Sequence, residues 1–355
     1  MDSLSLPLLS LIFLGCAAVI WIAGVQLSNT TDVLDDRLHL GSALGGIVLL
    51  AIATNLPELA ITVAAALSGN IGVAIGNILG GIAIQTVVLV ALDAFGVRVP
   101  RPLTYQAASL TLVLEAGLVI AVLTVAVMGS QLPAHLYGLR LTPASVLISA
   151  LWLVGVLLLN RASGRLPWQE AGEAPDNQRP SKGHAKTQKN ALATGKRVST
   201  GRVSTVFAVA AAATLVAGYL LERSGDAIAG HIHLTGVLFG ATVLAAATSL
   251  PELSTGLTSV RLGDYQLAMS DIFGGNAFLP VLFIFADLLS GKATLPQAQH
   301  TDIYLTGLGI LLTTVYLAGL LFRPRHTIAR VGVDSLAVLV LYAVGIAGLI
   351  AISTQ

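Results

Sequence analysis

Two glutamates occupy the middle of long apolar stretches of the chain. Glu58 ends the stretch ATNLPE at 53–58, and Glu252 ends the stretch ATSLPE at 247–252. An ionised carboxylate is costly in the hydrocarbon of a membrane, and acidic residues there mark ion or proton pathways. A proline beside each glutamate also interrupts the helix that would carry it. The chemistry that these residues can perform is the reversible binding of a cation.

The residues around the two glutamates offer hard oxygen ligands. Because proline has no N–H, Pro57 and Pro251 leave the carbonyl groups of Ala53 and Ala247 without a helical donor. Carbonyl groups released inside a membrane must find protein, water or an ion. Further oxygens come from the side chains of Thr54, Thr248, Asn55 and Ser249. Such a ligand set suits Na⁺, Ca²⁺ or H⁺ rather than a soft transition metal.

Two carboxylates that share one site repel each other. At a separation of about 5 Å and an effective dielectric constant of about 20, the repulsion is about 3.3 kcal/mol. An empty, doubly ionised site is therefore unfavourable to occlude. The site must hold a cation or protons while its access changes from one side of the membrane to the other. Pairing with Lys or Arg is the alternative, but neither residue lies in the middle of an expected span. The site therefore favours exchange over leak.

The composition is that of a polytopic membrane protein. Of the 355 residues, 55% are hydrophobic and 10% are charged, whereas soluble domains are about 25% charged. The formal net charge of +1 identifies no partner, and nothing supports nucleic-acid binding. Cys16 is the only cysteine, which excludes an intramolecular disulfide, a thiolate cluster and a redox pair. We expect no cofactor, inorganic cations and the lipid bilayer as partners, and find no signal for an oligomeric state.

Ten stretches of about 18 to 25 apolar residues can cross a hydrocarbon core of about 30 Å. They lie near 7–27, 40–67, 71–92, 108–128, 143–160, 205–222, 234–260, 265–290, 302–322 and 331–352. The first is expected to be a mature helix, because no basic residue precedes it. The segment 161–204 is rich in Pro, Gly, Ser, Lys and Arg, which predicts a basic flexible linker. It separates a five-span half at 1–160 from another at 205–355.

The basic residues predict the orientation of the spans. Sixteen of the 19 basic residues lie in the linker or in loops expected on the same side of the membrane as the linker, and three lie on the other side. Because basic loops stay in the cytoplasm, we expect a cytoplasmic linker and external N- and C-termini. The compact chain, without a large regulatory domain, suggests the cell (inner) membrane of a prokaryote.

The two halves contain an internal repeat. A shift of 194 positions aligns 39–93 with 233–287 without a gap, and 20 of these 55 positions are identical. Because each half has an odd number of spans, the two copies enter the membrane from opposite sides. Inverted repeats are typical of secondary transporters, whose binding sites lie near the midplane where the repeats meet. A duplication kept only for packing would not require matched intramembrane Glu, Thr and Pro.

A helix rich in small residues follows each broken helix. Small residues at a four-residue spacing, Gly76 and Gly80 in the first copy and Ser270 and Gly274 in the second, predict close packing against the broken helix. One face of each helix carries every fourth residue. These residues are Asn77, Gly81 and Gln85 in the first copy, and Asp271, Gly275 and Leu279 in the second.

Both elements resemble those of the calcium/cation antiporters, which include the sodium/calcium exchangers. That family carries a Gly-Thr-Ser-Leu-Pro-Glu-like element and then a Gly-Asn-x-x-Gly-Ser-Asn-x-x-Asn-like element in each inverted five-helix half. The resemblance covers 39–93 and 233–287 and implies an all-α integral membrane fold of about ten transmembrane helices. It also implies that Glu58 and Glu252 bind the ion. The residues that would offer backbone carbonyls are Thr54 and Thr248, Ala53 or Leu50, and Ala247 or Leu244.

The chain departs from the family pattern at several ligand positions. Asn55 replaces the first serine, and glycines replace the serines of the second element. The last polar position is Gln85 in the first repeat and Leu279 in the second. These changes remove ligands that the family uses for monovalent ions. Asp271 is a possible replacement, as a displaced protonatable or ion-binding group, with a packing or interfacial role as the alternative.

Five further acidic residues are expected to reach water. Glu115 could line the transport path, although a water-accessible or interfacial position is favoured. Four aspartates lie near expected helix ends, where water would solvate them. They are Asp93, Asp287, Asp302 and Asp334.

The sequence thus predicts a secondary antiporter that exchanges Ca²⁺ for Na⁺ or H⁺ by alternating access at a midplane site with two glutamates. Movement of spans one and six against the repeats would open the site to either side. The alternatives are a Na⁺/H⁺ or other monovalent cation exchanger, a passive cation channel, or a transport-dead scaffold. The predicted cation ligands are Glu58, Glu252, Thr54, Thr248, Asn55, Ser249, Ala53, Ala247, Gln85 and Asp271.

Overall fold

The computed structural model describes residue 1 and residues 4–38, 52–98, 101–164, 199–232 and 236–353. Within these ranges the chain is almost entirely helical, which confirms the predicted all-α fold class. Eight described helical segments are long and apolar enough to cross a membrane. The two other expected spans, 40–67 and 234–260, include residues outside the described ranges and are interrupted by helix breaks.

The first half contains six α-helices and one short 3₁₀ turn among its described residues. They are α1 (Leu6–Leu38), α3 (Leu56–Ser68), α4 (Ile71–Gly96), α5 (Leu103–Ala107), α6 (Leu110–Ser130), η1 (Ala134–Leu136) and α7 (Pro143–Gly164).

The second half begins with the long helix α9 (Thr200–His231) and continues through a segmented helix. The segments are α10 (Gly236–Phe239), the π-helical η2 (Gly240–Leu244), α11 (Ala245–Thr248) and α12 (Leu250–Leu262). The next span is interrupted by a 3₁₀ turn that contains Pro280, and it consists of α13 (Tyr265–Phe278), η3 (Leu279–Leu282) and α14 (Phe283–Ser290). The remaining elements are η4 (Leu295–Gln297), α15 (His300–Phe322), β1 (Thr327–Ile328), β2 (Val331–Gly332) and α16 (Val333–Ser353).

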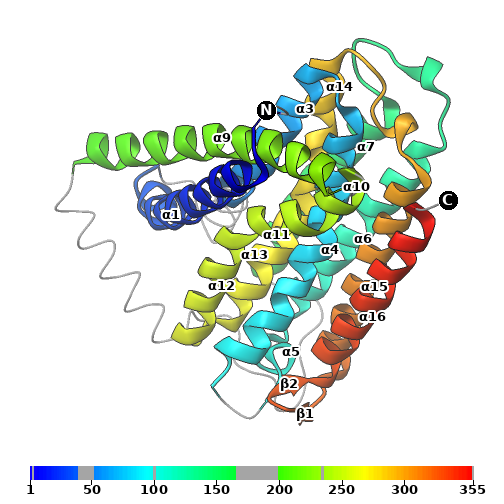
Figure 1. The fold of residues 1–355 in the computed structure, drawn as a ribbon. Coiled ribbons are helices and arrows are strands. Elements are labelled where there is room, and N and C mark those ends of the chain that lie inside the picture. Colours follow the sequence, from blue (N-terminus) through cyan, green and yellow to red (C-terminus); the bar gives the residue numbers. More distant parts are fainter. Residues whose placement is uncertain (2–3, 39–51, 99–100, 165–198, 233–235, 354–355) are drawn as a thin grey trace.

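Two helices are much longer than the sequence predicted. Helix α1 has 33 residues where 7–27 was expected, and α9 has 32 where 205–222 was expected. The ends of the expected linker at 161–204 are correspondingly helical, while its middle lies outside the described residues. Figure 1 shows α1 and α9 side by side, oblique to the other helices. Their mutual packing allows each helix to continue beyond its apolar stretch.

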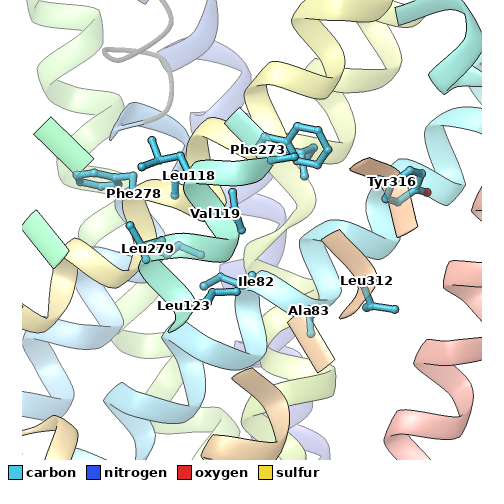
Figure 2. Close-up of a cluster of buried hydrophobic side chains, with 14 of the residues drawn as sticks. Ile82, Ala83, Leu118, Val119, Leu123, Phe273, Phe278, Leu279, Leu312 and Tyr316 are labelled. Carbon is cyan, nitrogen blue, oxygen red and sulfur yellow. The ribbon is translucent and has the colours of Figure 1, made fainter. Parts of the chain in front are cut away.

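The main core lies between helices of both halves. Figure 2 shows Ile82 of α4, Val119 of α6, Phe273 of α13 and Leu312 of α15 in one buried cluster. Small residues permit this close packing: a Cβ on Gly80 would lie 2.7 Å from the Ala241 Cα. The predicted packing of the small-residue helix against the broken helix is therefore present.

Two aspartates expected at water are instead buried caps that join the halves. Asp93 of α4 accepts hydrogen bonds from the backbone N–H of Leu103 at 2.8 Å and of Gly332 at 2.7 Å. Asp287, its repeat counterpart in α14, accepts from the N–H groups of Thr294 at 2.8 Å and Thr142 at 3.1 Å. Each aspartate thus binds the chain just before the last helix of the other half. The expected solvation was wrong because these donors replace water.

The other two aspartates were also placed wrongly at water. Asp302 and Asp334 are both buried. Asp302 accepts a hydrogen bond from the Gln299 N–H at 2.8 Å in a capping box, and Asp334 accepts one from the Thr104 hydroxyl. Helix caps and a neighbouring hydroxyl supply the donors that solvent was expected to supply.

Candidate functional site

Both Leu-Pro-Glu elements break a helix at the same repeat position. The breaks fall at Asn55 (φ −87°, ψ 13°) and at Ser249 (φ −81°, ψ 5°), and a new helix begins at the following leucine. Glu58 and Glu252 therefore lie in the first turns of α3 and α12. The N-terminus of a helix carries partial positive charge, which favours a carboxylate at that position.

The two glutamates are fully buried and meet across the repeats. Each interacts electrostatically with the other half: the Glu58 carboxylate lies near Glu252, and a threonine of the opposite repeat lies beside each carboxylate. Thr248 lies beside Glu58, and Thr54 lies beside Glu252. The two motifs thus lie together across the repeats, and each repeat places a threonine beside the glutamate of the other.

Helix α4, which follows α3 in the first repeat, also contacts Glu58. The Gln85 side-chain amide donates to the Glu58 carboxylate at 3.4 Å, and the Asn77 amide donates to the Glu58 backbone carbonyl at 3.4 Å. Gly275 of the second repeat leaves room for Asn55, because a Cβ on Gly275 would lie 2.9 Å from the Asn55 Nδ2. Three polar residues of the first repeat therefore surround the site.

The second repeat surrounds Glu252 differently. Asp271 interacts electrostatically with Glu252 and accepts a hydrogen bond from the Thr255 hydroxyl at 2.7 Å. Leu279 is buried in the main hydrophobic cluster and offers no ligand. The sequence did not identify Thr255, because its repeat counterpart is Ile61 and no motif includes it.

Several buried side-chain oxygens at this site have no hydrogen-bond partner. They are Glu58 Oε2, both carboxylate oxygens of Glu252, Gln85 Oε1, Asn77 Oδ1 and Asp271 Oδ1. A buried acceptor without a donor costs free energy, and an ionised one costs more. A cation or a proton among these oxygens would remove that cost. Within the described ranges no three of His, Cys, Asp and Glu gather closely enough to hold a metal ion, so amide, hydroxyl or carbonyl oxygens must complete any coordination.

The side chains of the remaining predicted ligands are buried near the breaks, where they pack or form hydrogen bonds within their own helical segments. Ala53 and Ala247 pack in the hydrophobic clusters formed with α1 and α9, which leaves only their carbonyl groups for an ion. The Ser249 hydroxyl donates to the Ala245 carbonyl at 2.7 Å, and the Thr248 hydroxyl donates to the same carbonyl at 3.1 Å. Leu50 lies outside the described residues.

Glu115 is buried rather than interfacial, contrary to the sequence-based interpretation. It lies in α6 and accepts a hydrogen bond from the Ser270 hydroxyl of α13 at 2.9 Å. The Glu115 side chain therefore faces the neighbouring helix and not the membrane surface. Hydropathy alone could not show this, because an isolated glutamate in an apolar helix fits both positions.

The long helices α1 and α9 contact the two broken helices at their prolines. A Cβ on Gly24 of α1 would lie 2.7 Å from Pro251 Cβ, and one on Gly218 of α9 would lie 3.2 Å from the Pro57 carbonyl oxygen. Gly24 and Gly218 are 194 positions apart, the same shift that relates the two prolines. The crosswise relation therefore extends beyond the aligned repeats to the first helix of each half.

Broken helices that meet at a buried acidic site from two halves of a membrane-spanning chain define a secondary transporter. The sequence profile of the family described as "Sodium/calcium exchanger protein" matches residues 8–171 and 203–351. The chain belongs to this family and is a multi-pass integral membrane protein. Its members are transporters, so the expectation that the chain is not an enzyme is confirmed.

Two curated bacterial proteins are similar over most of their length. The "Inner membrane protein YrbG" of Escherichia coli (strain K12) is 24% identical over 322 residues, which are 88% of this chain and 88% of that protein. The "Putative antiporter CaxA" of Alkalimonas amylolytica is 25% identical over 267 residues, which are 75% of this chain and 76% of that protein.

Solved exchanger structures share the fold. The H⁺/Ca²⁺ exchanger CAX superposes with a TM-score of 0.66 at 14% identity, covering 98% of this chain and 86% of that chain. The sodium-calcium exchanger NCX_Mj superposes with a TM-score of 0.61 at 16% identity, covering 97% of this chain and 99% of that chain.

Proposed function

We propose that this chain is a secondary antiporter that exchanges Ca²⁺ for Na⁺ or H⁺ at one site formed by Glu58 and Glu252. The observation that carries the proposal is the pair of buried glutamates, one from each repeat, whose oxygens lack sufficient donors. The names of the relatives support it, since one is a putative antiporter and the solved neighbours are named as H⁺/Ca²⁺ and sodium-calcium exchangers.

The chemistry of the site favours Ca²⁺ as one of the transported ions. Calcium prefers several oxygen ligands that include carboxylates, and it neutralises two glutamates at once. The Thr248 and Ser249 hydroxyls donate to a carbonyl, so they can present only lone pairs to an ion. Leu279 contributes no ligand, which leaves fewer oxygens for several monovalent ions at the same time.

The proposal includes ten spans in two inverted five-helix halves, with a cytoplasmic linker and external termini. The crosswise contacts of the glycines and prolines support the inverted arrangement, since each half supplies the same contact to the other. The location of one relative in the inner membrane of Escherichia coli supports a prokaryotic inner membrane.

Flux through purified protein in liposomes tests the function. We expect Ca²⁺ to leave loaded vesicles only when an opposing Na⁺ or H⁺ gradient is imposed, because an empty doubly ionised site is costly to occlude. Radioactive Ca²⁺ release is measured with Na⁺, K⁺ and pH gradients in turn. Release without a counter-ion would identify a channel, Na⁺/H⁺ exchange without Ca²⁺ would identify the monovalent alternative, and no flux would identify a scaffold.

We further propose that Asp271 takes the role of the ligand lost at Leu279. The variant Asp271→Asn is expected to slow Ca²⁺ exchange about tenfold, or about 1.4 kcal/mol, because it removes a negative charge beside Glu252. The initial rate and the coupling ratio are measured in the same liposomes. Thr255→Val is the control, since it removes only the hydrogen bond and should have a smaller effect. An Asp271→Asn protein with unchanged rate, coupling and pH dependence would reject this role.

A further inference from the structure

A fourth buried glutamate lies outside the central site, on the long helix α9. Glu222 is 1% exposed, and neither of its carboxylate oxygens has a hydrogen-bond partner. Burying an ionised carboxylate without a partner costs several kcal/mol, whereas the neutral acid can be buried at much lower cost. In the packed arrangement of this structure, the form of Glu222 that fits its surroundings is the protonated one.

The position of Glu222 places it at the contact between α9 and the first broken helix. It lies one turn after Gly218, whose Cα approaches Pro57 and Ala60 of α3 so closely that a Cβ would lie 3.0 Å from Ala60 Cβ. Residues four apart lie on the same helical face, and helical side chains lean toward the preceding turn. Thr214, one turn before Gly218, is also buried with an unpartnered hydroxyl. This polar face of α9 is therefore the face that packs on the core.

No other acid in the described surroundings could share a metal ion with Glu222. Helix α9 packs against α1, α3, α10 and η2. Helix α3 contains Glu58, which is turned toward α4 by its contact with Gln85, and α10 and η2 contain no titratable residue. The acidic residues of α1 all follow Thr31, at the end that lies beside the start of the antiparallel α9. The other charged or titratable neighbours are Cys16 of α1, and Arg223, exposed Asp226 and His231 of α9 itself.

We propose that Glu222 is a proton-binding site on α9, distinct from the central pair, whose proton is held while α9 packs on α3 and is released to water when α9 moves away. The step leaves a carboxylate and one hydrated proton, and it reverses when α9 returns. This proposal about Glu222 rests on the proposed antiport only because it takes α9 as the helix that moves. Proton release would thus be linked to the opening of one face of the transporter, because the charged form favours the separated arrangement.

Cys16 reports this movement without any transport. It is the only cysteine, and it is buried in the cluster that α1 and α9 form with Ile61 of α3. Alkylation of Cys16 by a neutral maleimide is measured in liposomes between about pH 6 and about pH 9, a range in which a shifted carboxyl can titrate. The rate of the natural protein is divided by that of Glu222→Gln at each pH, which cancels the effect of pH on the thiol itself.

We expect this ratio to rise at least about fivefold with pH, because glutamine cannot become charged and keeps α9 packed. Asp226→Asn, with the same charge change at an exposed position of α9, should react like the natural protein. Glu222→Asp should restore the pH dependence and thereby separates loss of a proton site from misfolding. A ratio that stays flat with pH, or a Cys16 that never reacts in the natural protein, would overturn the proposal. Either result is independent of whether Ca²⁺ is transported.

Discussion

Replacement of Glu252 by glutamine is expected to abolish Ca²⁺ exchange and, at the same time, to make the ion-free protein more resistant to heat. Both carboxylate oxygens of Glu252 are buried without partners, and Glu58 and Asp271 both lie near enough to repel it. The variant removes this repulsion but also removes half of the charge that holds a divalent ion. Losing one partner of a buried charge pair costs about 3 to 5 kcal/mol, which corresponds to a loss of flux of about 100-fold or more.

Thermal unfolding in detergent separates these two effects. A ligand that binds only the folded state raises the unfolding temperature, so added Ca²⁺ should stabilise the natural protein and not Glu252→Gln. Glu58→Gln should behave similarly, with a smaller gain in ion-free stability because Gln85 already donates to that carboxylate. Asp226→Asn serves as the control for a charge change at an exposed position. Full coupled flux in Glu252→Gln would show that the site assignment is wrong.

A single methyl group on Gly24 is expected to slow exchange about tenfold. The Cβ of an alanine at this position would lie 2.7 Å from Pro251 Cβ and 2.8 Å from Pro251 Cγ. The proline ring is rigid and cannot turn aside, so α1 must shift away from the break of the second repeat. Overpacking of this kind costs about 1 to 3 kcal/mol. This cost destabilises the transport state in which Gly24 lies against Pro251. The rate is measured as Ca²⁺ release from liposomes under a saturating counter-ion gradient.

The same helix provides a matched control for Gly24→Ala. No atom lies within 4 Å of a Cβ built on Gly15, so Gly15→Ala adds the same methyl group without a collision. It should leave the rate unchanged and strengthen the helix, since alanine is favoured over glycine by about 1 kcal/mol. Gly218→Ala, with Ala60 Cβ at 3.0 Å, should have an intermediate effect. Equal rates for the Gly24 and Gly15 variants would show that the contact with Pro251 does not limit transport.

The central pair could be predicted because each half repeats the same local signal. Proline beside an intramembrane glutamate is visible at Glu58 and again at Glu252, and the 194-residue shift places both on related helices. The family profile and the solved folds then agree with the class that these residues predict. The position of each threonine beside the glutamate of the other repeat was not predicted, since local sequence does not indicate which repeat faces which glutamate.

Other features could not be predicted, because their partners are distant in the sequence. Asp93 accepts a hydrogen bond from the Gly332 N–H, and Glu115 accepts one from the Ser270 hydroxyl, so their burial depends on helix packing rather than on neighbouring residues. The lengths of α1 and α9 likewise depend on contact between them, since hydropathy falls before either helix ends. Glu222 was missed for a related reason: its repeat counterpart is Ser28, so the comparison of the halves gave no signal.

The capping aspartates have a consequence for the assembly of the chain. Asp93 and Asp287 each bind backbone N–H groups of the opposite half, so one half by itself would bury a carboxylate with part of its donors missing. Each half therefore depends on the other to complete the hydrogen bonds of its buried aspartate. The two halves are better understood as parts of one folding unit than as separate domains.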